Sequence, residues 1–488
     1  MTYSTLSASL LTHRFWTTKL LTIFQERDLI KSSFTPFVLL LTASCFAQQP
    51  AKSQELAHPQ SSLATSAPTV SYILAGRLFD AASDQVRETM VIVVEGERIK
   101  AVSPAAQIRI PQGANVVDLS RSTVLPGLID CHTHMEARAD RYNEIYKFKD
   151  SPFTEAFFAV GNARRTLEAG FTTVRDVGSK PFLAVDLRNS IAEGFTVGPR
   201  IVASGPGISI TGGHGDLNNY SPQTRVSMFP EQRDFKIADG VDQIRQTVRA
   251  QVKYGVDVIK ILATGGVLSK GDSPGAPQYT FEELKAAADT AHMAGRKIAA
   301  HAHGTQGIKN AILAGIDSIE HASLIDDEGI RLAKEHGTYL VMDIYNDEYL
   351  LNEASKFGLP AENLEKEKMV GQLQRENFAK AVKAGVKMAF GTDAGVYPHG
   401  DNARQFHYMV QFGMTPAQAI HAATSSAADL IGRSKDVGTI EQGKYADIIA
   451  VDTDPLADVR ALEHVNFVMK GGVVYKDTHT NPRQASTE

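Results

Sequence analysis

The sequence predicts an α/β protein in which a (β/α)8 TIM-type barrel is joined to a small β domain formed from both ends of the chain. Two observations predict this fold. Between residues 125 and 432, helical runs alternate with short β-branched runs, and most of the helical runs end at a glycine. On either side of this region lie short β-rich runs separated by turn residues.

The beginning of the chain differs in composition from the rest. The stretch FTPFVLLLTASCFA (34–47) is apolar, follows Lys31, and ends in small residues suited to cleavage after Ala47. It is too short for a typical membrane span. We therefore predict a signal peptide over 1–47 and export of the mature chain to the periplasm or the medium, with no stable membrane span.

Two details of this region leave alternatives open. TASC resembles an imperfect lipoprotein site at Cys45, and the whole segment could instead be a disordered N-terminal tail. Residues 48–69 are rich in Gln, Ser, Ala and Pro, which is typical of a linker. After cleavage only Cys131 is certain to remain, so no intramolecular disulfide is expected.

The bulk composition is that of a soluble globular protein. The 488 residues are 43% hydrophobic and 22% charged, with a net charge of −5. This mild charge does not indicate binding to nucleic acid or to an anionic membrane. We expect the protein to form a homo-oligomer.

The β domain is predicted from two separate segments. Residues 70–124 contain runs such as TMVIVVEGERIKAV, and residues 433–478 contain ADIIAVDTD and FVMKGGVVYK with Asp-Pro and Gly-Gly turns. We expect one β-sandwich from these two parts, followed by a tail over 479–488.

The central region has eight candidate strands. Seven helical runs end just before a strand, most of them at a glycine: Gly170, Gly194, Gly255, Gly295, Gly315, Gly337 and Gly385. The strands are LPGLIDCHTH, TTVRDVG, RIVASG, DVIKILATGG, KIAAHAHG, DSIEHAS, TYLVMD and KMAFGTDAG. A doubly wound sheet is the alternative, but the strand count and the residues at the strand ends favour the barrel.

Candidate metal ligands follow several of these strands. In such barrels the chemistry lies at the carboxyl ends of the strands. The residues found there or within the strands are His132, His134, Lys260, His301, His303, Glu320, His321 and Asp393. Each has a structural alternative: a hydrogen-bonded core histidine, a helix N-cap at Asp393, or a lysine that extends out of the barrel. Imidazole and carboxylate groups together are typical ligands of zinc and similar divalent ions, which activate water and polarise a carbonyl.

The sequence resembles the amidohydrolase superfamily of metal-dependent hydrolases. VLPGLIDCHTHME resembles its first-strand signature, and EQGKYADIIAVDTDPL resembles the β-domain segment that frames its barrel. DVIKILATGGV, AAHAHG, SIEHASLID and GTDAG resemble the branch that contains Xaa-Pro dipeptidase (prolidase) and imidazolonepropionase-like proteins. The resemblance extends from about residue 70 to residue 478.

The resemblance implies two divalent metal ions, expected to be zinc, and a metal-bridging hydroxide. It implies that His132 and His134 hold one ion, that His301 and His321 hold the other, and that Asp393 completes the site beside the first pair. Lys260, carboxylated by CO2, would bridge both ions, since burial favours the neutral amine that adds CO2.

Catalytic and substrate-binding roles are also implied. Asp393 is expected to carry the proton from the attacking water to the leaving amine. His214, in the loop ITGGHGD, and His303 are expected to contact substrate, with His301 preferred to His303 as the metal ligand. Arg175 and Asp176 are read as a structural ion pair, and Gln405 stands where this branch suggests a glutamate.

Several functions remain as alternatives. Imidazolonepropionase and the one-metal deaminases of the superfamily carry a glutamate three residues after the strand-five histidine, where this chain has Gly304. Phosphotriester or lactone hydrolysis could use the same binuclear site. A non-catalytic binding protein would be expected to lack ligands, and none of the six is missing. We predict hydrolysis of the amide bond of a dipeptide or N-acyl amino acid, with ochratoxin-type aryl amides as further candidates. All of these are small-molecule substrates with a carboxylate next to the amide.

Overall fold

The computed structural model describes residues 69–228 and 232–479. The predicted signal peptide, the candidate lipoprotein site at Cys45, nearly all of the predicted linker and all but the first residue of the tail lie outside these ranges. No helix within the described ranges is both long and apolar enough to cross a membrane.

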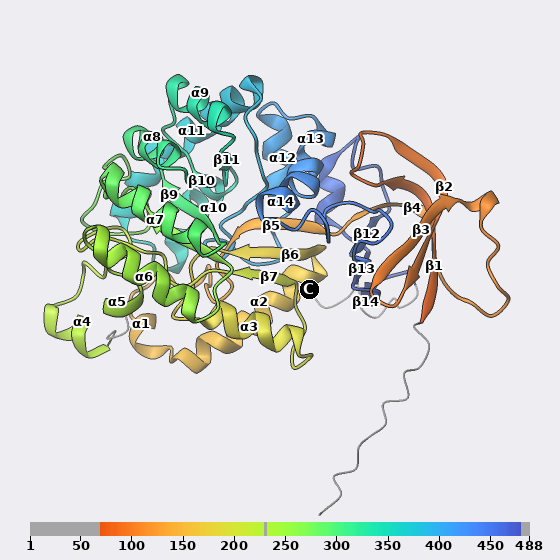
Figure 1. Cartoon of the computed structure of the whole chain (residues 1–488), viewed down its shortest axis with the longest axis horizontal. Helices are drawn as coiled ribbons and strands as arrows, with labels where there is room; N and C mark the ends of the chain where they lie inside the picture. Colours follow the sequence, from red (N-terminus) through yellow and green to blue (C-terminus); the bar gives the residue numbers. More distant parts are fainter. Residues whose placement is uncertain (1–68, 229–231, 480–488) are drawn as a thin grey trace, which may run out of the picture. The chain divides into compact units, whose positions relative to one another are not determined.

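One sheet contains strands from both ends of the chain (Figure 1). Its strand order is β14-β13-β12-β4-β1-β2-β3. The N-terminal strands are β1 (Val70–Phe79), β2 (Val86–Glu95), β3 (Arg98–Pro104) and β4 (Asn115–Pro126). The C-terminal strands are β12 (Ile448–Val451), β13 (Phe467–Lys470) and β14 (Val473–Asp477). Chain ends that are far apart in sequence therefore complete one hydrogen-bonded sheet, in which β12 pairs with β4 antiparallel.

Seven parallel strands form two further sheets. The first contains β5 (Leu128–Thr133), β6 (Phe171–Asp176) and β7 (Arg200–Ala203). The second contains β8 (Val258–Leu262), β9 (Lys297–Ala302), β10 (Ser318–His321) and β11 (Tyr339–Val341). A helix follows each strand, which is the alternation predicted from the sequence.

The helices that follow these strands are the long ones of this region. They are α2 (Pro152–Glu168), α3 (Leu183–Ala192), α6 (Val241–Lys253), α7 (Phe281–Met293), α8 (Thr305–Leu313), α9 (Asp327–His336) and α11 (Ala361–Ala384). Each is followed by one of the seven predicted glycines, and all seven glycines have positive φ. Gly337 and Gly385 are themselves C-caps, at φ of 68° and 70°, which the absence of a Cβ permits.

The other α-helices of the described ranges are shorter. They are α1 (Tyr146–Lys149), α4 (Pro222–Met228), α5 (Gln232–Phe235), α10 (Asn346–Asn352), α12 (Arg404–Gln411), α13 (Pro416–Ala422) and α14 (Ser425–Leu430).

The eighth predicted strand, within residues 387–395, is an extended segment that has only isolated bridges, among them Leu340 to Met388 and Thr133 to Ala394. The reason lies in its hydrogen bonds. The N–H of Phe390 donates to the carbonyl of Ala422 instead of to a neighbouring strand, while Cys131 N–H donates to the carbonyl of Phe390. The segment therefore joins β11 to β5 without a regular ladder. Another isolated bridge, Ile208 to Ile261, links the segment after β7 to β8.

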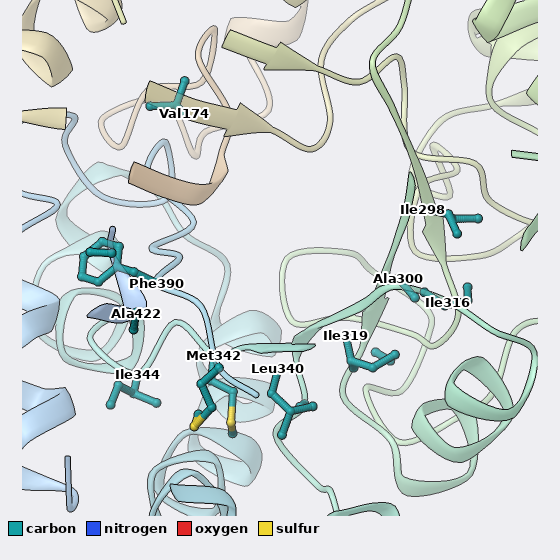
Figure 2. Packing of buried hydrophobic residues seen from close by; sticks show 14 of the residues in the cluster. Val174, Ile298, Ala300, Ile316, Ile319, Leu340, Met342, Ile344, Phe390 and Ala422 are labelled. Atoms are coloured by element: carbon teal, nitrogen blue, oxygen red, sulfur yellow. The ribbon is translucent and has the colours of Figure 1, made fainter. Parts of the chain in front are cut away.

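Alternation along the parallel strands separates an apolar side from a polar side. Figure 2 shows Val174, Ile298, Ile319, Leu340 and Phe390 from different strands, with side chains directed away from one another and toward surrounding helices. Residues one position along the strand face the opposite way. On β8, β9 and β10 the opposite side therefore carries Lys260, His301 and Glu320.

Candidate metal centre

The candidate ligands meet at the carboxyl ends of the parallel strands. All six predicted ligands line one cavity of about 560 Å3, together with His214 and His303. All of them except His134 and His214, which are partly exposed, are buried. The fold therefore brings together residues that lie between positions 132 and 393 of the chain.

His132, His134 and Asp393 form the first group of candidate ligands. Nε2 of His134 lies 3.0 Å from Oδ1 of Asp393, and Nε2 of His132 lies 3.5 Å from the same oxygen. Nδ1 of His134 lies 2.7 Å from the carbonyl oxygen of Gly178, so this nitrogen donates its hydrogen there. Nε2 of His134 is then free to bind a cation shared with Asp393.

The pKa values of this group are those of a paired acid and base. Burial by itself lowers the pKa of His134, but the neighbouring Asp393 carboxylate raises it to about 9. Burial by itself raises the pKa of Asp393, but His132 and His134 lower it to about 2. A cation placed between these residues would replace the proton that they share.

His301, His303 and His321 form the second group. One nitrogen from each lies within 4.8 Å of the others. Burial and the neighbouring histidines hold the pKa values of His301 and His303 well below the usual range. Neutral imidazoles offer lone pairs to a divalent ion, so this group also fits a metal. His321 belongs to a further group with His132 and Asp393, which connects the two halves of the site.

Acceptors behind the histidines fix their orientation. Nδ1 of His321 lies 2.9 Å from Oδ1 of Asp343, and Nδ1 of His303 lies 2.8 Å from the hydroxyl oxygen of Ser323. Such partners set the tautomer and leave Nε2 for a metal or a substrate.

The sequence analysis missed Asp343, Asn346 and Gln374. The Gln374 amide donates to Asp343 at 2.9 Å, and the Asn346 amide donates to both Asp343 and Asp393. Asp343 is the last residue of the seventh predicted strand, TYLVMD, so its position was a usable signal. Gln374 lies inside α11, and no local pattern identifies it.

Lys260 lies at the middle of β8, with 2% of its surface exposed. Within the described part of the chain, no hydrogen bond or ion pair engages its amine. Burial lowers the pKa of Lys260 to about 8, while Glu320 and Asp393 oppose this shift. An amine that loses its proton this readily fits the neutral nucleophile that carboxylation requires.

The predicted ion pair of Arg175 with Asp176 is wrong. Arg175 donates to Glu320 at 2.8 Å and to Ser318 at 2.9 Å, beneath the candidate ligands. Asp176 instead accepts the N–H of Met135 at 2.7 Å. Adjacent residues of a strand point to opposite sides, so the two side chains separate.

Glu320 contacts both Arg175 and the candidate ligand His132. Its second oxygen lies 3.1 Å from Nδ1 of His132. Burial by itself raises the pKa of Glu320, but Arg175 and His132 hold it well below the usual range. Glu320 therefore remains ionised.

His214 lies directly against the second group. Its ring stacks on that of His301 with centroids 4.2 Å apart, and Nδ1 lies 2.8 Å from the hydroxyl oxygen of Ser269. A Cβ on Gly266 would lie 2.2 Å from the His214 ring. Gly266, the second glycine of ATGG, therefore leaves room for the imidazole of His214. Burial lowers the pKa of His214 to about 4, which favours a neutral ring.

Two candidate ligands have an unusual backbone. His321 and Asp393 have φ of 66° and 58°, in the left-handed region that non-glycine residues seldom adopt. Such conformations cost free energy and concentrate at functional sites. His321 is the last residue of β10, and Asp393 lies in the extended segment 387–395; both side chains line the cavity.

Gln405 joins the ends of two strand segments. Its side-chain amide donates to the carbonyl oxygens of Met342 and Gly391. A glutamate carboxylate at this position would accept hydrogen bonds and could not donate to both carbonyls. Gln405 therefore steadies the segments that lead into Asp343 and Asp393.

Strand-end imidazoles, a carboxylate and a buried amine around one cavity are the donor set of a metal-dependent hydrolase. Comparison with known proteins agrees with this class. The sequence profile described as "Amidohydrolase family" matches residues 123–475, and the chain belongs to that family. It is a hydrolase that acts on C–N bonds.

Three relatives illustrate the similarity. Ochratoxinase of Aspergillus niger is 31% identical over 94% of this chain and 97% of its own length. Imidazolonepropionase of Fusobacterium nucleatum is 25% identical over 79% of this chain and 91% of its own length. A crystal structure of a Xaa-Pro dipeptidase with methionine bound in its active site superposes with a TM-score of 0.79 at 39% identity, covering 84% of this chain and all of that one.

Proposed function

We propose that this hydrolase uses two divalent metal ions to cleave the amide bond of a dipeptide or an N-acyl amino acid. The observation that carries the proposal is that His321 clusters both with His301 and His303 and with His132 and Asp393. The unpaired amine of Lys260 lies in the same cavity. Similarity to a Xaa-Pro dipeptidase and to ochratoxinase supports amides as the substrate class.

In this proposal His132, His134 and Asp393 would hold one ion, and His301 and His321 would hold the other. Carboxylated Lys260 would be a ligand of both ions. Zinc is the expected metal because imidazole nitrogens and carboxylate oxygens suit it. Divalent ions bound there would supply an activated water at neutral pH and polarise the amide carbonyl.

Side chains in the cavity transfer the proton and bind the substrate. Asp393 accepts the proton of the attacking water and donates it to the leaving nitrogen, because its carboxylate lies among the ligands. His214 and His303 bind the substrate carbonyl or carboxylate from the cavity wall. Asp343 and Gln374 hold His321 in place.

A one-metal imidazolonepropionase or deaminase mechanism is less consistent with the chain. A Cβ on Gly304 would lie 2.3 Å from the carbonyl oxygen of Gly275. A glutamate therefore has no room three residues after His301 unless the backbone shifts. Hydrolysis of a lactone or phosphotriester is the second candidate, since the ligand set does not by itself select the bond.

Three other inferences accompany this proposal. The two parallel sheets and the segment 387–395 form one eight-stranded barrel, supported by the isolated bridges between them. The enzyme is exported after cleavage near Ala47, supported by the apolar stretch that precedes it. It acts as a homo-oligomer, which size measurements on the purified protein would test.

A substrate screen tests the function directly. The enzyme, supplied with zinc and bicarbonate, is offered alanyl-proline, alanyl-leucine, alanyl-arginine and N-acetyl-leucine, with a phosphotriester and a lactone in parallel. Amide cleavage supports the proposal. Cleavage of only the phosphotriester or the lactone contradicts it.

A further inference from the structure

Lys236 is a lysine of the cavity wall that does not belong to the candidate metal ligands. It lies just after α5, is half-buried, and lines the same cavity as Lys260 and His301. Within residues 69–228 and 232–479, no hydrogen bond or ion pair engages its ammonium group. An ammonium that has lost part of its hydration without gaining a partner is costly, so it requires an explanation.

Three other cations that line the cavity already have carboxylate partners. The pairs are Arg138 with Asp140, Arg141 with Asp150, and Lys180 with Glu155. Lys147 lies over the ring of Tyr220, with its ammonium 5.5 Å from the ring centroid. Within the described ranges, Lys147 and Lys236 are therefore the cavity cations outside the metal centre that lack a carboxylate partner, and Lys236 is the one that lies along the loop of His214.

The backbone of Lys236 is held in place. Its carbonyl oxygen accepts the N–H of Ser209 at 2.8 Å, and the carbonyl of Phe235 accepts the Gln251 amide at 2.7 Å. The hydroxyl oxygen of Ser209 also accepts the N–H of Gly215 at 3.0 Å. Ser209 therefore fixes Lys236 and the loop of His214 to each other.

The Lys236 side chain extends along this loop. A Cβ on Gly215 would lie 3.0 Å from Cε of Lys236, so the glycine leaves space for the lysine stem. Gly215 directly follows His214, whose ring stacks on His301. Lys236 thus lies along the loop that carries His214 and lines the same cavity as the candidate metal ligands.

The charges near Lys236 leave it without a carboxylate of its own. Among the acidic residues, Asp216 has the largest electrostatic effect on the pKa of Lys236. Its oxygens, however, are engaged by Arg225 and by backbone N–H groups. Lys147 and Lys180 oppose the charge of Lys236, and Glu136 favours it weakly.

Burial lowers the pKa of Lys236 to about 8. A bound anion would favour the protonated form and offset the cost of burial. His214, whose own pKa Lys236 lowers, is the remaining titratable neighbour.

We propose that Lys236 binds the carboxylate of the amino-acid part of the substrate and so selects amides with a free carboxylate. This inference rests on the proposed amidase function and adds the residue that determines its specificity. With the carboxylate at Lys236, the adjacent amide lies beside His214 and the metal ligands. No covalent step is involved, since the contact is a charge-assisted hydrogen bond.

The test compares each dipeptide and N-acyl amino acid of the screen with its C-terminal carboxamide. The carboxamide keeps the shape and removes the charge. Wild-type enzyme should prefer the carboxylate form by roughly 10- to 150-fold in kcat/KM, the range of a hydrogen bond to a charged group. Lys236→Met should lose this preference, mostly through KM, and should cleave the carboxamide at nearly the wild-type rate.

Two further variants keep the result interpretable. Lys236→Arg retains the charge, so it should retain the preference for the carboxylate form. Above pH 8 the wild-type KM for the carboxylate form should rise as Lys236 loses its proton, whereas the Lys236→Arg variant should keep its preference. Lys149→Met makes the same substitution at an exposed lysine of α1 outside the cavity lining, and should leave the preference unchanged.

The outcomes separate this inference from the proposed function. If wild-type enzyme cleaves no amide, the proposed function fails. If it cleaves the carboxylate and carboxamide forms equally well, or if Lys236→Met slows both equally while metal content is unchanged, the role of Lys236 is wrong and the amidase function stands.

Discussion

The seven-stranded sheet and the carboxyl ends of the parallel strands use burial in opposite ways. In the sheet, Ile73 and Ile92 are paired across β1 and β2 and are fully buried, as expected of a core that only stabilises the fold. At the strand ends, buried positions instead hold histidines, carboxylates and an amine without a partner. A chain retains such costly groups where a ligand offsets their desolvation.

Replacing Lys260 should have the largest effect on activity. Lys260→Ala removes the proposed bridge between the two ions, so kcat/KM should fall by roughly 10³-fold or more and bound metal should decrease. Metal analysis, kinetics and mass spectrometry for added CO2 on the wild type measure this. The matched control is Lys297→Ala, because Lys297 is a partly exposed lysine of β9 that pairs with Asp317. Full activity and metal content in Lys260→Ala would refute the bridge.

Asp393→Asn should have the second largest effect on activity. The amide keeps the size of the side chain but cannot accept the proton of the attacking water, so kcat should fall by roughly 10²- to 10⁴-fold. The pH profile should also change, because the carboxylate that shares a proton with His134 is gone. An unchanged kcat would exclude Asp393 as the proton carrier.

Comparison of His301→Ala with His303→Ala should separate a ligand from a supporting residue. If His301 binds the metal, its loss should reduce both metal content and kcat/KM more than loss of His303. Loss of a residue that contacts only substrate or a ligand should cost roughly 10- to 100-fold. The reverse order would assign His303 as the ligand, which the clustering of both rings around His321 also permits.

The smallest effect on activity is expected in the seven-stranded sheet. Ile92→Ala should leave kcat/KM within about twofold while lowering the free energy of unfolding by about 2–5 kcal/mol, because it opens a cavity in a packed core. Urea unfolding and kinetics on the same preparation measure both. A large loss of activity in the folded variant would mean that the two regions are coupled.

Much of the α/β fold could be predicted because local patterns encode it. Seven glycines with positive φ end the helical runs, and seven of the eight predicted strands are present. The eighth is irregular because Phe390 donates to Ala422, a contact between segments that no local pattern reveals. For the same reason the partner of Arg175 was mispredicted. Glu320 lies 145 residues away in sequence, and only strand packing brings the two together.

By itself, the sequence determined which chemical groups reach the strand ends, since helix caps and strand alternation are local properties of the chain. It also identified Lys260 as a cation in an apolar strand. Only the tertiary structure decided which carboxylate orients which histidine, and that Lys236 faces the cavity without a partner. Those features depend on distances between segments that are far apart in the chain, and such distances are set by packing.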